Sequence, residues 1–242
     1  MKLIQSVAMA MVLALAIVTS PMALADQEQP SAHQVVQLTT DRMMTIIESA
    51  RDYFDRDPER FYREIEQVLE DVVDFDSFAR GVMGPYASKR GYMALSTREE
   101  KQAYKDRMER FSRVFKDGLV HTYAKGLLTA NGNEIAVLPP KEGEDLSGAS
   151  SVTVVQNIYG EAEKPYVVQY KMRKNRQGEW KLRNVTIEAI NLGVIYQSQF
   201  ASAAAQYNGD IDRVIDFWSV DPTVAAANVN VASSKYTDDD DE

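Results

Sequence analysis

The sequence contains no cysteine, so disulfide bonds, thiolate zinc sites, iron–sulfur clusters and cysteine nucleophiles are all excluded. It has only two histidines, His33 and His121, which excludes a metal site built from several histidine ligands. Basic residues are also scarce: 27 Lys and Arg stand against 36 Asp and Glu, and the formal net charge is −9. Because contacts to phosphates need clustered positive charge, we expect no nucleic-acid partner.

The motifs of common enzyme chemistry are missing as well. The chain has no GxSxG, HExxH, GxGxxG or P-loop pattern. Asp74 and Asp76 form a D-x-D pair around Phe75, but a helix cap explains Asp76 without a metal. His121 lies within an expected long helix, where the sequence cannot supply its acid or nucleophile. We therefore predict that the protein is not an enzyme and holds neither a cofactor nor a metal ion.

Long hydrophobic runs are confined to the first residues of the chain. Residues 7–18 (VAMAMVLALAIV) are apolar throughout, whereas spanning a bilayer as a helix takes about 20 such residues. The run follows Lys2 and precedes Ala23-Leu24-Ala25, a small-x-small cleavage pattern. We predict a signal peptide over residues 1–25, removed on export, and a periplasmic protein that begins at Asp26.

Helices dominate the first half of the remaining sequence. Apolar residues recur with a period near 3.6 over residues 34–54, and Asp57-Pro58-Glu59 is a typical helix start. Asp76 is expected to cap a short helix that ends at Gly84-Pro85. A capping box in residues 96–99 opens a helix of about 30 residues, which should run to Leu128.

Strands follow, and helices return after them. Residues 134–138, 151–159, 166–174 and 179–187 predict an antiparallel meander of about four strands, with a hairpin turn at residues 175–178. Two helices are expected near residues 192–206 and 210–218. The fold class is therefore α+β, with a domain over residues 26–218. Residues 219–242 lack a periodic apolar pattern and end in Asp-Asp-Asp-Asp-Glu, which predicts an acidic disordered tail.

Four motifs in register resemble the MlaC-type periplasmic phospholipid-transport proteins, also called the toluene-tolerance family. Residues 72–84 (VVDFDSFARGVMG) match the family's V-D-F-D stretch with its following A-R and Gly. Residues 122–124 match its T-Y-A near the end of the long helix. Residues 180–182 (WKL) resemble its Trp-containing strand, and residues 196–200 (YQSQF) resemble a late helix.

This resemblance implies a fold and a function. The family fold is a twisted antiparallel sheet, similar to the NTF2-like cone, which helices wrap to enclose an apolar cavity for acyl chains. The implied protein is a monomeric carrier of diacyl phospholipid. It would move lipid between an inner-membrane ABC lipid transporter complex and an outer-membrane lipoprotein complex.

We expect the cavity to lie between the long helix and the sheet. The candidate lipid-binding residues are large apolar side chains of the helices and strands: Phe78, Val82, Met83, Met108, Phe111, Phe115, Leu119, Tyr123, Val168, Tyr170, Trp180, Leu182, Tyr196 and Phe200. Considered alone, each of these apolar residues is also consistent with packing in a filled hydrophobic core. Two other functions stay open: an enzyme on an NTF2-like cone acting on a small apolar substrate, with His121 and Asp76 as its residues, and a lipid-free adaptor that binds proteins.

Overall fold

The computed structural model describes residues 29–128, 134–144, 146, 148–160 and 164–220 of the chain. The predicted signal peptide and residues 221–242 of the predicted tail lie outside the described residues. Seven α-helices and a short 3-10 helix are described: α1 (Ala32–Ala50), α2 (Pro58–Val72), α3 (Phe75–Met83), η1 (Gly84–Ala87), α4 (Lys89–Met93), α5 (Arg98–Leu127), α6 (Leu192–Gln206) and α7 (Ile211–Asp216). Within the described part of the chain, no helix combines the length and apolar character needed to cross a membrane.

The strands form one open antiparallel sheet, which together with the helices confirms the predicted α+β class. The strands are β1 (Ile135–Val137), β2 (Ser151–Ile158), β3 (Tyr166–Lys174), β4 (Trp180–Ile187) and β5 (Ile190–Asn191). Each strand pairs with its neighbour in sequence, in the order β1-β2-β3-β4-β5, so the meander has one short strand more than expected. Gly178, with a φ of +83°, takes the left-handed conformation that the β3–β4 turn requires.

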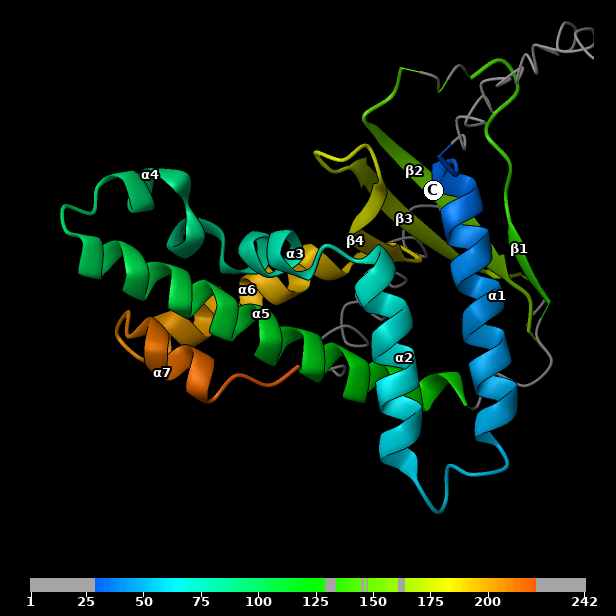
Figure 1. Ribbon diagram of the computed structural model, residues 1–242, viewed down its shortest axis with the longest axis horizontal. Helices are drawn as coiled ribbons and strands as arrows, with labels where there is room; N and C mark the ends of the chain where they lie inside the picture. Colours follow the sequence, from blue (N-terminus) through cyan, green and yellow to red (C-terminus); the bar gives the residue numbers. More distant parts are fainter. Residues whose placement is uncertain (1–28, 129–133, 145, 147, 161–163, 221–242) are drawn as a thin grey trace, which may run out of the picture.

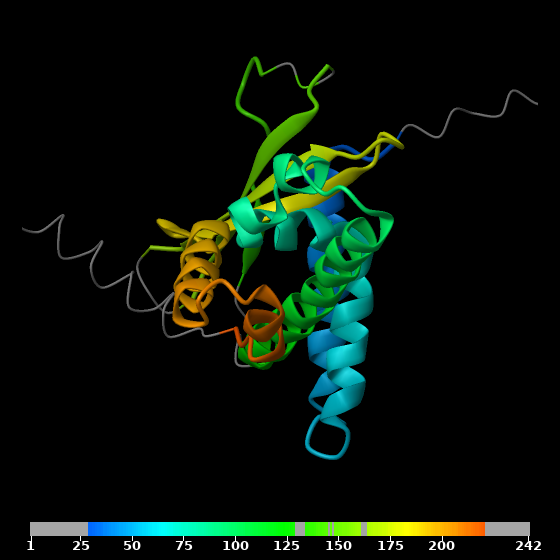
Figure 2. The ribbon, with the colours of Figure 1, turned by 90° about the vertical axis from the view of Figure 1, so that its left-hand side faces the viewer.

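The first two helices form a hairpin that extends beyond the sheet (Figures 1 and 2). Ser31 begins α1 with a capping box to Gln34, and Asp57 begins α2 by accepting a hydrogen bond from the Arg60 backbone N–H. The proline and acid after Asp57 act as predicted, because Pro58 occupies the first helical position. The C-terminal end of α5 packs against this hairpin.

Two helix starts differ from the sequence prediction. Asp74, not Asp76, caps α3, because the Asp74 carboxylate accepts the Ser77 backbone N–H at 2.8 Å. The capping box of α5 pairs Thr97 with Glu100, one residue later than expected. In both places two nearby residues, Asp74 and Asp76 or Ser96 and Thr97, satisfy the same capping pattern, and the path of the preceding chain decides which of the two occupies the cap position.

The buried apolar residues fall into two clusters. The larger one joins α3, α5, α6 and α7 to the sheet, and its centre is aromatic. The smaller one lies inside the helical hairpin, where Phe61 and Ile65 of α2 contact the last turns of α5. Val220, which the prediction assigned to the tail, is buried in the larger cluster and lies against Gly118 of α5. The packed chain therefore continues to the last described residue.

Candidate functional site

An apolar cavity of about 180 Å³ lies between the helical hairpin and the inner face of the sheet. It occupies the seam between the two hydrophobic clusters, since Val36 and Met172 belong to the larger and Ile47 to the smaller. Its lining is uncharged and comes from α1, α2, α5 and the first four strands: Val36, Thr39, Thr40, Met43, Met44, Ile47, Leu69, Val72, Leu127, Ile135, Gln156, Ile158, Tyr170, Met172 and Leu182. Such a surface favours an aliphatic guest.

A chain of hydrogen bonds crosses this cavity from the sheet to α1. Tyr170 Oη donates to Gln156 Oε1 at 2.7 Å, and Gln156 Nε2 donates to Thr40 Oγ1 at 2.7 Å. Thr40 Oγ1 in turn donates to the Val36 carbonyl at 2.9 Å. Burial raises the pKa of Tyr170 to about 12, so this hydroxyl stays protonated at physiological pH. These hydrogen bonds connect strands β3 and β2 to helix α1.

The structure places two of the candidate lipid-binding residues, Tyr170 and Leu182, on this cavity. The others are outside the cavity lining, and most lie within or against the larger cluster: Phe78, Val82, Met83, Met108, Phe111, Phe115, Leu119, Tyr123, Trp180, Tyr196 and Phe200. Val168 is buried on β3 but is not part of that cluster. That any of them contacts a lipid stays a prediction. The space among the central rings is occupied by the rings themselves.

The rings at the centre of the larger cluster contact one another closely. The ring of Phe111 lies 4.9 Å from that of Phe200 and 5.7 Å from that of Phe115. Phe115 in turn packs edge-on against Phe78 at 5.2 Å and Tyr196 at 5.5 Å. Phe111, Phe115, Tyr196 and Phe200 have essentially no exposed surface. Such interdigitated packing is typical of a structural core.

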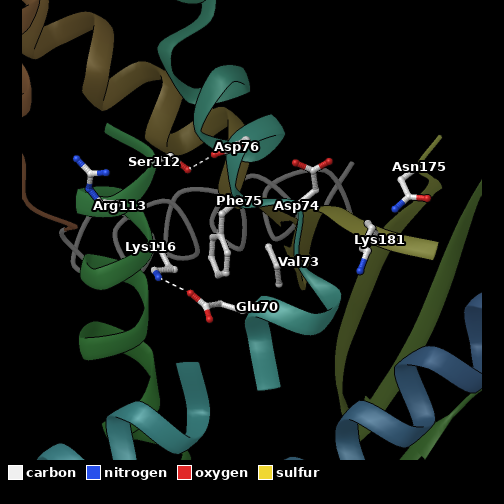
Figure 3. Close-up of a pocket in the computed structure, with 10 residues that line it drawn as sticks. All are labelled: Glu70, Val73, Asp74, Phe75, Asp76, Ser112, Arg113, Lys116, Asn175 and Lys181. Carbon is white, nitrogen blue, oxygen red and sulfur yellow. Dashed lines mark hydrogen bonds and ion pairs between the residues drawn. The ribbon is translucent and has the colours of Figure 1, made fainter. Parts of the chain in front are cut away.

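A separate, polar cleft lies where α2 passes into α3, beside α5 and β4 (Figure 3). Lys116 reaches across it and pairs with Glu66 at 2.5 Å and Glu70 at 2.6 Å. Partial burial opposes the charge on Lys116, but the hydrogen bonds to both glutamates outweigh that effect and raise its pKa. Ser112 donates to Asp76 at 2.7 Å on the same side. Among the charged residues that line this cleft, Lys116 and Glu70 therefore pair with each other, whereas Asp74 and Lys181 pair with neighbours outside the lining, Arg183 and Glu179.

The V-D-F-D motif has a structural role at this cleft. Asp74 caps α3, pairs with Arg183 of β4 at 3.1 Å, and donates its backbone N–H to the Leu182 carbonyl. The preceding Val73 forms a bridge to Leu182, which also lines the apolar cavity. The motif thus fixes the helices to the strand that carries one cavity wall.

The residues of the enzyme alternative are far from a common site. His121 is exposed on α5, where its ring lies tilted against that of Tyr62, with 4.5 Å between the ring centroids, and Nδ1 lies 2.9 Å from the Asp117 carbonyl. Asp76 lies on α3, accepts a hydrogen bond from Ser112 and lines the polar cleft, whose lining does not include His121. His33 lies near the start of α1. The structure brings none of these three side chains together.

The α1 and α2 walls of the cavity were not identified from the sequence, nor was its buried carboxamide, Gln156. Met43, Ile47 and Val72 were recognised only as apolar positions of helices, without a partner surface. Gln156 had a usable signal, because it continues the alternation of Val152 and Val154 and so faces the core. A polar residue at an inward position of a strand is the signal for a site.

Comparisons with known proteins agree with this fold. The sequence model of the MlaC protein family matches residues 37–220. Toluene tolerance protein ttg2D from Pseudomonas putida is 30% identical over 187 residues, which covers 77% of this chain and 79% of that protein. A phospholipid-binding protein from Ralstonia solanacearum, solved in complex with a phospholipid, superposes with a TM-score of 0.62 at 21% identity. The match covers 84% of this chain and 99% of that one.

Proposed function

The chain belongs to the MlaC protein family, and from this premise we propose that it is a periplasmic carrier that holds a diacyl phospholipid by its acyl chains. The observation that carries the proposal is the uncharged cavity between the helical hairpin and the sheet. The shared fold with a protein solved in complex with a phospholipid supports it. In this proposal Tyr170 and Leu182 contact acyl chains, and the other candidate residues form the packed wall behind them.

The cavity must widen to take up its ligand. Its volume of about 180 Å³ is smaller than that of most small-molecule sites, which span about 300–1,000 Å³. The helical hairpin is the wall suited to move, because α1 meets the sheet through aliphatic contacts and the Thr40–Gln156 hydrogen bond. Met43 and Met44 on that wall are unbranched and flexible, and so can follow the shape of an acyl chain.

The energetics suit a shuttle rather than a permanent store. Burying an acyl chain is worth about 0.8 kcal/mol per methylene, but a bilayer offers nearly the same gain. The carrier therefore needs only a small net preference, and its partners set the direction of transfer. We propose an inner-membrane ABC lipid transporter complex and an outer-membrane lipoprotein complex as these partners. The net charge of −9 disfavours adsorption to anionic lipid surfaces on the way.

The test places a charge on the cavity wall. Met44→Lys puts an ammonium group among aliphatic side chains, where an unpaired charge costs several kcal/mol. We expect protein purified from the periplasm without detergent to carry phospholipid, and the Met44→Lys variant to have lost most of it. Native mass spectrometry measures the bound lipid, and circular dichroism checks folding.

The matched control is Leu38→Lys on the same helix. Leu38 is 56% exposed and lies outside the cavity lining, so its variant should keep the full load of lipid. Full lipid in a folded Met44→Lys variant would move the binding site elsewhere. Wild-type protein that neither carries nor takes up phospholipid would contradict the carrier function itself.

A further inference from the structure

Gln156 is a polar residue inside an otherwise aliphatic cavity. It follows Val152 and Val154 on the inward face of β2, and only 3% of its surface is exposed. Apart from Gln156, the polar groups of the lining are hydroxyls, and those of Thr39 and Thr40 donate to backbone carbonyls of their own helix. The carboxamide is therefore the strongest hydrogen-bonding group that the cavity offers to a guest.

The hydrogen bonds of this carboxamide are incomplete. Its Oε1 accepts from Tyr170 and its Nε2 donates to Thr40, both at 2.7 Å. An amide nitrogen carries two hydrogens, so one N–H has no partner among the described residues. Leaving a buried donor unpaired costs free energy, and such a group in a cavity usually receives a partner from water or ligand.

The chemistry of the lining selects the partner. No residue that lines the cavity within the described part of the chain is charged, so an anionic phosphate would be buried without compensation. A neutral acceptor satisfies the amide at no such cost. In a diacyl lipid, neutral acceptors lie where the fatty chains begin, as the carbonyl oxygens of the two esters.

We propose that the free N–H of Gln156 donates to an ester carbonyl of the bound lipid, and that the protein thereby distinguishes acyl esters from ether-linked lipids. The inference rests on the proposed carrier function and specifies its ligand. Tyr170 and Thr40 act as positioning residues, because they hold the two ends of the carboxamide. The fatty chain beyond the ester then contacts the aliphatic wall formed by Val72, Met172 and Leu182.

The experiment compares two lipids that differ only in these carbonyls. Full-length mature protein is loaded from vesicles that contain equal amounts of a dioleoyl phosphatidylglycerol and of the ether-linked phosphatidylglycerol with the same chains. Native mass spectrometry then counts the two bound lipids. One hydrogen bond of ordinary strength predicts that the wild type prefers the ester by about threefold to tenfold.

Two variants attribute the preference to the carboxamide. Gln156→Leu removes the donor at similar size, so the ester-to-ether ratio should fall to about one. Tyr170→Phe keeps the ring and removes the hydroxyl that orients Gln156, so the ratio should fall part of the way. Gln169→Leu is the matched control, because Gln169 is exposed on β3, and it should keep the wild-type ratio.

The outcomes separate this inference from the carrier function. Equal loading of both lipids in the wild type means that water satisfies the amide, which overturns the inference and leaves the carrier function standing. An unchanged ratio in folded Gln156→Leu overturns it too. Loading of neither lipid overturns the carrier function and, with it, the assignment of Gln156. Because the wild-type ratio alone can overturn the proposal, the test does not depend on how well Gln156→Leu folds.

Discussion

Two apolar regions lie beside α5: the aromatic cluster, which is the ring-packed centre of the larger hydrophobic cluster, and the cavity between the helical hairpin and the sheet. Side chains fill the first region, whereas the second is open. Phe111 and Phe115 of α5 meet Phe78, Tyr196 and Phe200 at ring distances of about 5 Å. Between three and five turns later the same helix contributes Leu127 to a cavity of about 180 Å³. Rigid rings of large area fill the first space, whereas aliphatic and methionine side chains line the second. The comparison teaches that one long helix can pack into a filled core along its middle turns and border an open cavity at its C-terminal end.

The largest effect should come from emptying the filled space. Phe115→Ala removes a ring with no exposed surface, and such a change in a core costs about 3–5 kcal/mol of folding free energy. Met43→Ala, at a half-buried position on the cavity, should cost less than half as much, because the space beside it is already open. Urea unfolding measures both. Equal losses at the two positions would remove the distinction between core and cavity.

A smaller effect should come from cutting the tie between the hairpin and the sheet. Thr40→Val removes the acceptor of Gln156 and should cost about 1 kcal/mol, while lipid exchange with vesicles becomes faster because α1 separates more easily. Thr45→Val is the control, since the Thr45 hydroxyl also donates one turn back along α1, to the Asp41 carbonyl, at an exposed position. Exchange rates from fluorescent lipid dequenching should differ between the two variants. Identical rates would show that the hairpin does not open at Thr40.

The smallest effect should come from the ion pairs between α5 and α7, which lie outside the aromatic cluster. Arg107 and Arg110 of α5 both pair with Asp212 of α7 at 2.6 Å. Hydrogen bonds from Arg107, and then from Arg110, lower the pKa of the Asp212 carboxyl. A lowered pKa in the folded state means that this contribution is present above the carboxyl's usual pKa and is lost as pH falls through the lowered value.

Asp212→Asn should therefore lower the melting temperature slightly near neutral pH, and the gap from the wild type should close in acid. The effect is small because the Asp212 side chain is about half exposed, 49%, and solvent screens the pair. Asp106→Asn is the control, since Asp106 accepts from the neutral side chain of Gln102. Thermal scans over a pH series measure both variants. If the difference in melting temperature between Asp212→Asn and the wild type persists in acid, the loss of stability comes from packing and not from the ion pairs.

Local signals in the sequence predicted the elements well. The expected bounds of β3 (Tyr166–Lys174) and α6 (Leu192–Gln206) match the structure. For β3, the alternation of apolar and polar residues stops just before a turn in which Gly178 has a positive φ. The hydrophobic period and the turn residue therefore indicate the same end of the strand. The cap of α3 was wrong, because Asp74 and Asp76 both precede apolar helical residues and only the pairing of Asp74 with β4 distinguishes them.

The position of the cavity could not be predicted from the same signals. Periodicity tells which face of a helix is buried, and it did so for Phe115 and for Ile47 alike. It does not tell how far the opposing surface lies, and that distance decides whether side chains interlock or leave space. The family resemblance suggested acyl chains beside α5, whereas the open space lies nearer α1. Only the packing of the hairpin against the sheet, through contacts remote in sequence, locates it.

The two adjacent methionines on the cavity wall have a chemical consequence in a chain without cysteine. Oxidation converts the thioether of methionine into a polar sulfoxide, which is poorly accommodated among aliphatic groups. Met43 and Met44 are half-buried, so oxidants reach them more readily than they reach the fully buried Met83 and Met172. A bound fatty chain would shield both thioethers. The empty carrier is therefore the form that oxidative damage should inactivate, and the loaded carrier the form that it should spare.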